Sequence, residues 1–145
     1  MNCLWQLDLK LICKRSNKSI ELDPKYVDSY YNRGVVRFAL GDKQGAMADY
    51  TKAIEIDPKY SSAYYNRGNI LDDLGNKQAA FEDYNKAIEF KPDHANAYFN
   101  RAFARVGLSD KQGAIRDYTK AAELYEKAGL TKDYQTALDR VKKLQ

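Results

Sequence analysis

Residues 30–34 read Tyr-Tyr-Asn-Arg-Gly, and this pentad governs the interpretation of the chain because it recurs. Residues 64–68 repeat it without change, and residues 98–102 repeat it as Tyr-Phe-Asn-Arg-Ala, so each copy begins 34 residues after the previous one. A fixed period of this length is typical of stacked helical repeats, in which each repeat buries its apolar face against its neighbours. The pentad therefore predicts an all-α repeat fold.

A second stretch returns at the same period and predicts two helices in each repeat. Residues 40–46 read Leu-Gly-Asp-Lys-Gln-Gly-Ala, and close variants occupy residues 74–80 and 108–114. In the first repeat, Gly41 should end the first helix and the second should run from about Lys43 to Ile56, because glycine suits a helix end. Tyr30, Gly34 and Leu40 are expected to face the core.

The period divides the chain into segments of one continuous domain. We predict three repeats, at residues 27–60, 61–94 and 95–128. A helical partial repeat precedes them at residues 1–26, and a capping helix follows at residues 129–145. Residues 16–24 match residues 50–58, so the partial repeat is read as a second helix without its first. Apolar residues alternate over residues 5–11 and also allow a strand. An uncovered apolar surface is expected to associate with another chain or fold back, and its residues are Leu4, Trp5, Leu7, Leu9 and Ile12.

Composition narrows the classes of function. The net charge of +4 comes from 24 basic and 20 acidic residues spread over all repeats, so nucleic-acid binding is neither required nor excluded. No run approaches the ~18 apolar residues of a membrane span, and two cysteines without a CxxC motif suit a reducing compartment. A cytoplasmic protein is expected, with no membrane partner. With one histidine, His94, and no phosphate-loop motif, we expect no enzyme, no metal and no cofactor.

The residues at these positions resemble the tetratricopeptide repeat (TPR). In the first repeat the resemblance rests on Tyr30, Gly34, Ala46, Tyr50 and Pro58, and it extends over residues 16–128. It implies a right-handed helical-repeat solenoid. The sequence departs from the family pattern at Arg33, Arg67 and Arg101, where the family usually has leucine.

The resemblance also implies a function, because in this family the first helices line a concave groove that holds a peptide or a partner helix. We therefore expect a protein-interaction adaptor. Asn32, Asn66 and Asn100 would form a ladder that grips a main chain, beside aromatic anchors at Tyr31, Tyr65 and Phe99. Asp72 and Asp73 would make the centre acidic and favour a basic or neutral ligand. The remaining predicted groove residues are Val35, Asn69 and Phe103.

Two alternatives stay open. Arginines at a regular spacing beside aromatic residues could bind single-stranded nucleic acid, although acidic residues are interleaved on the same helices. Repeats one and two agree at about half of their positions, and consensus-like repeats are readily designed. The chain could thus be a designed or consensus scaffold without a natural ligand.

Overall fold

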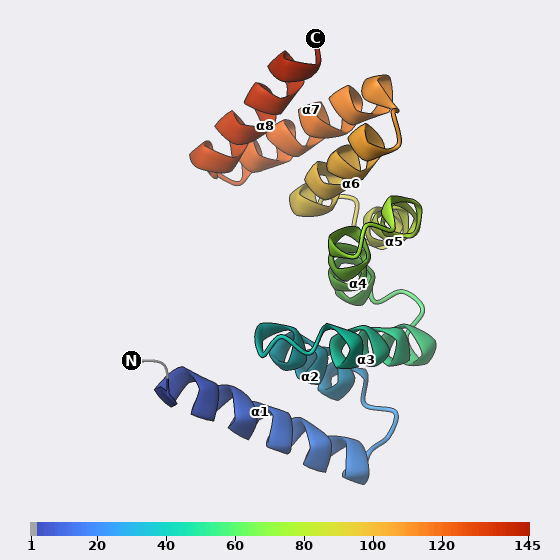
Figure 1. Ribbon diagram of the computed structural model, residues 1–145, viewed down its shortest axis with the longest axis vertical. Helices are drawn as coiled ribbons and strands as arrows, with labels where there is room; N and C mark the ends of the chain where they lie inside the picture. The colour runs from blue at the N-terminus through green and yellow to red at the C-terminus, as the bar shows by residue number, and fades with distance from the viewer. Residues whose placement is uncertain (1–2) are drawn as a thin grey trace. The chain divides into compact units, whose positions relative to one another are not determined.

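The computed structural model describes the backbone of residues 3–145 and the side chains from Leu7 onward. Leu4 and Trp5, part of the predicted association surface, therefore have side chains outside the described residues. Over the described backbone every regular element is a helix, which confirms the all-α prediction and shows that the strand alternative for residues 5–11 was wrong (Figure 1). The helices are α1 (Cys3–Leu22), α2 (Val27–Ala39), α3 (Lys43–Ile56), α4 (Ser61–Asp73), α5 (Lys77–Phe90), α6 (Ala95–Gly107), α7 (Lys111–Lys127) and α8 (Thr131–Leu144).

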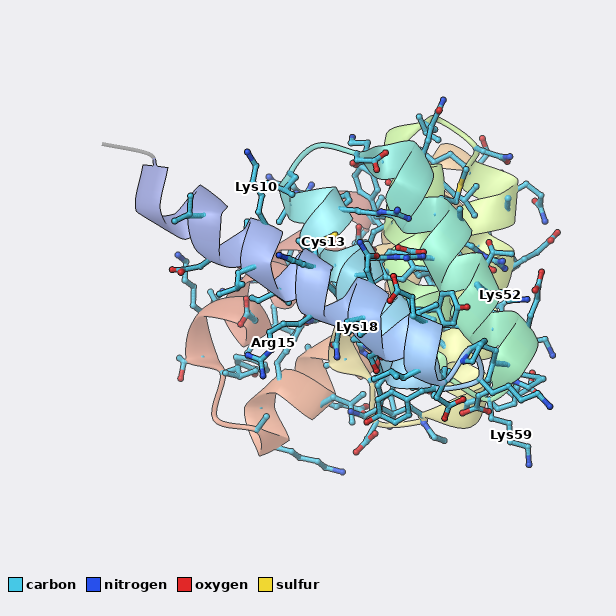
Figure 2. All side chains as sticks on the ribbon, turned by 90° about the horizontal axis from the view of Figure 1, so that it is seen from below. Lys10, Cys13, Arg15, Lys18, Lys52 and Lys59 are labelled. Carbon is cyan, nitrogen blue, oxygen red and sulfur yellow. The ribbon has the colours of Figure 1, made fainter. Side chains whose placement is uncertain are left out.

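The chain forms two compact units, residues 1–67 and residues 68–145, and the division falls within α4. In the first unit α1 lies against α2, and the Ser29 hydroxyl donates a 2.6 Å hydrogen bond to the Ser19 hydroxyl between them. Lys10 and Arg15 are both exposed and point away from α1 in different directions (Figure 2). The partial repeat at the start of the chain is thus a single helix that packs on the first full repeat.

The turn inside each repeat has the same construction. The second residue after the first helix adopts a positive φ, at Gly41 (86°), Gly75 (81°) and Ser109 (64°). The second helix then begins with a side-chain cap, because Asp42, Asn76 and Asp110 each accept a hydrogen bond from the backbone N–H three residues on. The recurring heptad at residues 40–46 is therefore a turn and a helix start.

A tyrosine from each second helix fills the core beside a small residue of the first helix. Tyr50, Tyr84 and Tyr118 are at most 2% exposed. A Cβ atom added at Gly34 would stand 2.7 Å from Tyr50 Cε1, and one at Gly68 would stand 2.8 Å from Tyr84 Cε1. The predicted core positions of Tyr30 and Gly34 are confirmed, whereas Leu40 is 38% exposed and does not belong to the core.

In the second unit α8 covers α7 with an apolar stripe. Tyr134 and Leu138 pack on the buried cluster around Tyr125, and Val141 and Leu144 pack on the cluster around Tyr118. Leu130 precedes the helix and is 47% exposed.

Replacing Gly34 by leucine should lower the free energy of unfolding by about 1–3 kcal/mol, because the new side chain must displace the Tyr50 ring. Leucine favours helix more than glycine does, so a loss can be assigned to packing. Urea denaturation measures the change. Gly107→Ala is the control, since its Cβ would meet only the flexible Lys77 side chain at 3.2 Å. Equal stability of the two variants would contradict this account of the core.

Candidate functional site

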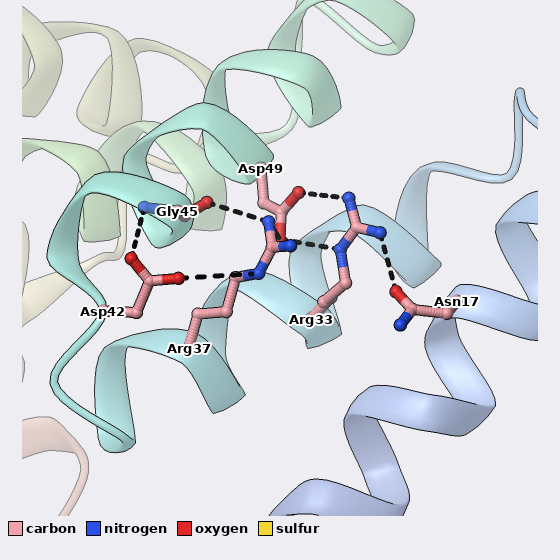
Figure 3. A network of polar contacts seen from close by, with 6 residues as sticks. All are labelled: Asn17, Arg33, Arg37, Asp42, Gly45 and Asp49. Carbon is pink, nitrogen blue, oxygen red and sulfur yellow. Dashed lines mark hydrogen bonds and ion pairs between the residues drawn. The ribbon is translucent and has the colours of Figure 1, made fainter.

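The arginine that departs from the family pattern is held inside the first unit (Figure 3). Arg33 Nε and Nη2 donate to the two carboxylate oxygens of Asp49 at 2.9 and 2.6 Å, and Arg33 Nη1 donates to Asn17 Oδ1 at 2.8 Å. Arg37 Nη1 adds a third bond to Asp49, at 2.9 Å. The hydrogen bonds to Asp49 raise the pKa of Arg33 above its usual value. The Arg33 guanidinium thus ties together α1, α2 and α3.

The second unit repeats the arrangement. Arg101 donates to both oxygens of Asp117 at 2.8 and 2.6 Å and to Asn85 Oδ1 at 2.8 Å, while Arg105 lies 3.2 Å from Asp117 Oδ2. The guanidinium groups of Arg33 and Arg101 therefore bind carboxylates of their own unit. They are not offered to a phosphate backbone as the nucleic-acid alternative requires.

The predicted groove residues of the first unit divide into held and exposed side chains. Asn66 Nδ2 donates to the Tyr31 hydroxyl at 3.2 Å, and the Tyr31 ring contacts Tyr50 and Tyr60 with centroids 5.9 and 5.2 Å apart. Tyr65 is half-buried, and it too interacts with other residues. Asn32 and Val35 are exposed. Tyr31 and Asn66 therefore support the helix packing, whereas Asn32 and Val35 are open to solvent.

In the second unit the asparagines also bond to one another. Asn69 Oδ1 accepts from Asn100 Nδ2 at 2.8 Å and from the Tyr84 hydroxyl at 2.9 Å. Phe99 packs edge-on against Tyr118 with centroids 5.0 Å apart. The amides of Asn66 and Asn100 thus donate within their own units, and ligand binding by the ladder of Asn32, Asn66 and Asn100 stays a prediction.

Lys77 changes the expected charge of the groove centre. Its ammonium lies 2.7 Å from Asp72 Oδ1 and 4.6 Å from the centroid of the Phe103 ring. Asp72 is therefore neutralised, and the acidic centre expected from Asp72 and Asp73 is reduced, although Asp73 itself is exposed. Lys77 is the first residue of α5. Its contacts with Asp72 of α4 and Phe103 of α6 form only when the chain is folded.

A small pocket opens between α6, α7 and α8 beside Phe103. Its volume is ≈ 90 Å³, and it is lined by Phe103, Val106, Tyr118, Arg140, Lys143 and Leu144. Burial raises the pKa of the Tyr118 phenol, and the charge of Arg140 partly opposes that rise. The pocket is apolar with two cations on α8, and neither cation was among the residues predicted from the sequence.

Exposed apolar pairs stand at equivalent repeat positions of α2 and α6. Val35 and Phe38 on α2 correspond to Phe103 and Val106 on α6, and all four are between 40% and 43% exposed. The members of each pair are three residues apart and so lie on one side of their helix. The middle repeat has Asn69 and Asp72 at these positions. The first-helix face is thus apolar in the first and third repeats and polar in the second.

Comparison with known proteins agrees with this geometry. A family model of the tetratricopeptide repeat matches residues 27–60 and 61–94. The chain is similar to the MamA protein, with 31% identity and a TM-score of 0.71 over 81% of this chain and 64% of that one. It also resembles the TPR2B domain of yeast Sti1, solved in a complex with pHsp70 (24% identity, TM-score 0.74, 81% and 94% of the two chains). A third similar structure is the first TPR of Spaghetti (RPAP3) bound to the HSP90 peptide SRMEEVD (24%, 0.74, 84% and 92%). A comparison with curated proteins gives no match.

These matches define the class: the chain is a helical-repeat protein of the tetratricopeptide type. More particularly, residues 27–60 and 61–94 match the model of the tetratricopeptide-repeat family, whose members generally mediate protein–protein interactions. Among the described residues, no group of three or more His, Cys, Asp or Glu side chains is placed to hold a metal ion. Within the same part of the chain, no helix has the length and apolar character needed to cross a membrane.

Asp49→Ala should lower the free energy of unfolding by about 3 kcal/mol, because it leaves Arg33 and Arg37 without the carboxylate that they share. The control is Glu55→Ala, which removes an exposed ion pair with Lys52 and should cost less than about 1 kcal/mol. Denaturant titration gives both values. If the two variants lose the same stability, the buried pair does not hold the unit together.

Proposed function

We propose that this protein is an interaction adaptor that binds a peptide or a partner helix on the exposed faces of its first helices. The observation that carries the proposal is the repeated apolar pair, Val35 with Phe38 and Phe103 with Val106. Large apolar side chains exposed at helical spacing are typical of binding surfaces. Aromatic anchors such as the two phenylalanines contribute much of the affinity at interfaces.

The pocket beside Phe103 supports a more detailed proposal about the ligand. Its wall is apolar and its volume of ≈ 90 Å³ suits one aliphatic side chain, while Arg140 and Lys143 supply positive charge. An apolar residue next to an acidic one would satisfy both features, since charge complementarity selects among ligands of similar shape. This changes the expected ligand, because the sequence alone favoured a basic or neutral centre.

Among the residues proposed from the sequence, Asn32, Val35, Asp73 and Phe103 are those exposed to a ligand. Asn66, Asn69, Asn100 and Asp72 would act by holding the first-helix faces in shape. The complexes of Sti1 and Spaghetti show what related folds can hold, and the proposal for this chain rests on its own side chains. We also propose a cytoplasmic location, which agrees with the free thiol of Cys13.

Selection of a random peptide library on the full chain tests the proposal. Enriched peptides should pair an apolar residue with Asp or Glu, and Phe103→Ala should weaken the best of them about thirtyfold, equivalent to ~2 kcal/mol. Fluorescence anisotropy gives the affinities. Leu74→Ala is the matched control, because Leu74 is also exposed but lies in a turn.

A charge reversal tests the cations separately. Arg140→Glu and Lys143→Glu should each weaken an acidic peptide, whereas Lys142→Glu makes the same charge change on α8 at a residue that does not line the pocket. Equal effects of Lys142→Glu and Lys143→Glu would show a long-range charge effect and contradict the assigned site.

A further inference from the structure

α1 follows the pattern of the second helices but lacks their central side chain. The match of residues 16–24 to residues 50–58 puts Ser16 at the position that Tyr50, Tyr84 and Tyr118 hold in α3, α5 and α7. Those three rings are at most 2% exposed, and Ser16 is itself 7% exposed. A small hydroxyl group therefore stands where every full repeat has a buried phenol.

An open pocket lies beside Ser16. It has a volume of ≈ 290 Å³ between α1 and α2 and is lined by Ile12, Arg15, Ser16, Ser19, Ser29 and Asn32. This volume is larger than the about 150 Å³ of a cavity that admits benzene, and five of the six lining residues are polar, so the pocket has both the room for an aromatic ring and hydrogen-bonding groups for a phenol. The hydroxyls of Ser19 and Ser29 are hydrogen-bonded to each other at 2.6 Å, and both residues line the pocket.

The first full repeat shows how such a ring would be held. The Tyr50 phenol is hydrogen-bonded to Asn66 on the following first helix, and Gly34 on its own first helix leaves room for the ring. Asn32 precedes Asn66 by one period and lines the pocket beside Ser16. A phenol placed in this pocket would meet an equivalent asparagine amide.

We propose that the pocket receives a tyrosine side chain from a helix of a partner protein, docked on α1 where the first helix of a repeat would pack. In the full repeats the small residue is on the first helix and the ring on the second. At α1 the second-helix residue is small, so the docking helix must bring the ring. Arg15 is an exposed cation at the rim (Figure 2), and it can lie over the ring face, as Arg33 lies over Tyr30 at 5.5 Å.

A second copy of this chain is the other candidate occupant. The exposed Leu7, Leu11 and Ile12 extend the apolar surface of α1 and include part of the association surface predicted from the sequence. However, the first helices of this chain carry Gly34, Gly68 and Ala102 at the position that would face Ser16. None of them fills the pocket in this register, so the proposal commits to a different protein. The pocket shares Asn32 with the residues proposed for the peptide ligand, and its other lining residues are not among them.

The first experiment uses p-cresol, which is the tyrosine side chain alone, and follows the amide signals of Ser16 and Asn32 by NMR in the full chain. Ser16→Tyr should fill the pocket and weaken p-cresol binding at least tenfold. Lys14→Tyr, which adds the same ring on the exposed side of α1, should leave binding unchanged. Asn32→Ala should weaken p-cresol about three- to tenfold through the lost hydrogen bond, and toluene less than twofold.

The second experiment exchanges the large and the small side chain between the docking helix and residue 16 of α1. The probe is a helix-stapled peptide of residues 61–73 carrying Gly68→Tyr, compared with the same peptide carrying the natural glycine. The tyrosine peptide should bind the natural chain at least tenfold more tightly than the glycine peptide. With Ser16→Tyr in the chain the preference should reverse, because the small and large residues have changed sides.

Several results would overturn the proposal. One is p-cresol binding that Ser16→Tyr does not affect, and another is equal loss of p-cresol and toluene binding in Asn32→Ala. Inorganic phosphate that shifts the same amides when p-cresol does not would make this an anion site. A chain that is dimeric by light scattering and becomes monomeric with Ser16→Tyr would show that a second copy is the occupant. If Ser16→Tyr does not fold, the Asn32→Ala comparison and the two peptides on the natural chain still decide.

Discussion

The bidentate pair between a first-helix arginine and a second-helix aspartate is the contact on which each unit depends. The Asp49 side chain is 3% exposed and accepts hydrogen bonds from both Arg33 and Arg37. An unpaired carboxylate at such a depth would be costly, so the arginines must stay in place. Because Arg33 also bonds to Asn17, the same guanidinium joins three successive helices, and Arg101 does the same in the second unit through Asn85. Directional bonds of this kind set the register of neighbouring helices, which apolar packing alone defines less closely.

Around this contact, the tyrosine and its small neighbour set the distance between helices. Tyr50 can approach α2 only because Gly34 has no side chain. Asp49, one residue earlier in α3, is buried as well, and a lower local dielectric strengthens its ion pair. The two contacts join the same two helices, so each one favours the alignment that the other needs.

The local features of the fold could be predicted from the sequence, and the side-chain partners could not. The bounds of α3 and the turn at Gly41 follow from helical spacing and turn chemistry, which act over a few residues. The partners of Arg33, and the neutralisation of Asp72 by Lys77, depend on residues that only folding brings together. The sequence nevertheless contains a signal for the partners of Arg33. Aspartate recurs at residues 49, 83 and 117. The first and third repeats also pair an arginine with a glycine, Arg37 with Gly45 and Arg105 with Gly113, where the second repeat has Leu71 and Ala79. A Cβ at Gly113 would meet the Arg105 guanidinium, which explains the joint change.

The positions that differ between repeats are therefore the informative ones for function. Gly34 with Tyr50 and Arg33 with Asp49 are packing contacts between the two helices of the repeat. Val35 and Phe38 are exposed, so replacing them by Asn69 and Asp72 in the middle repeat costs the fold little, since surface substitutions are usually within about 0.5 kcal/mol. Ser16 is a different case, because it departs from the pattern at a buried position and leaves ≈ 290 Å³ open. A core position can remain unfilled in a stable helix pair only if the loss is tolerated or another molecule supplies the missing ring, and Asn32 still offers that ring a hydrogen-bonding amide.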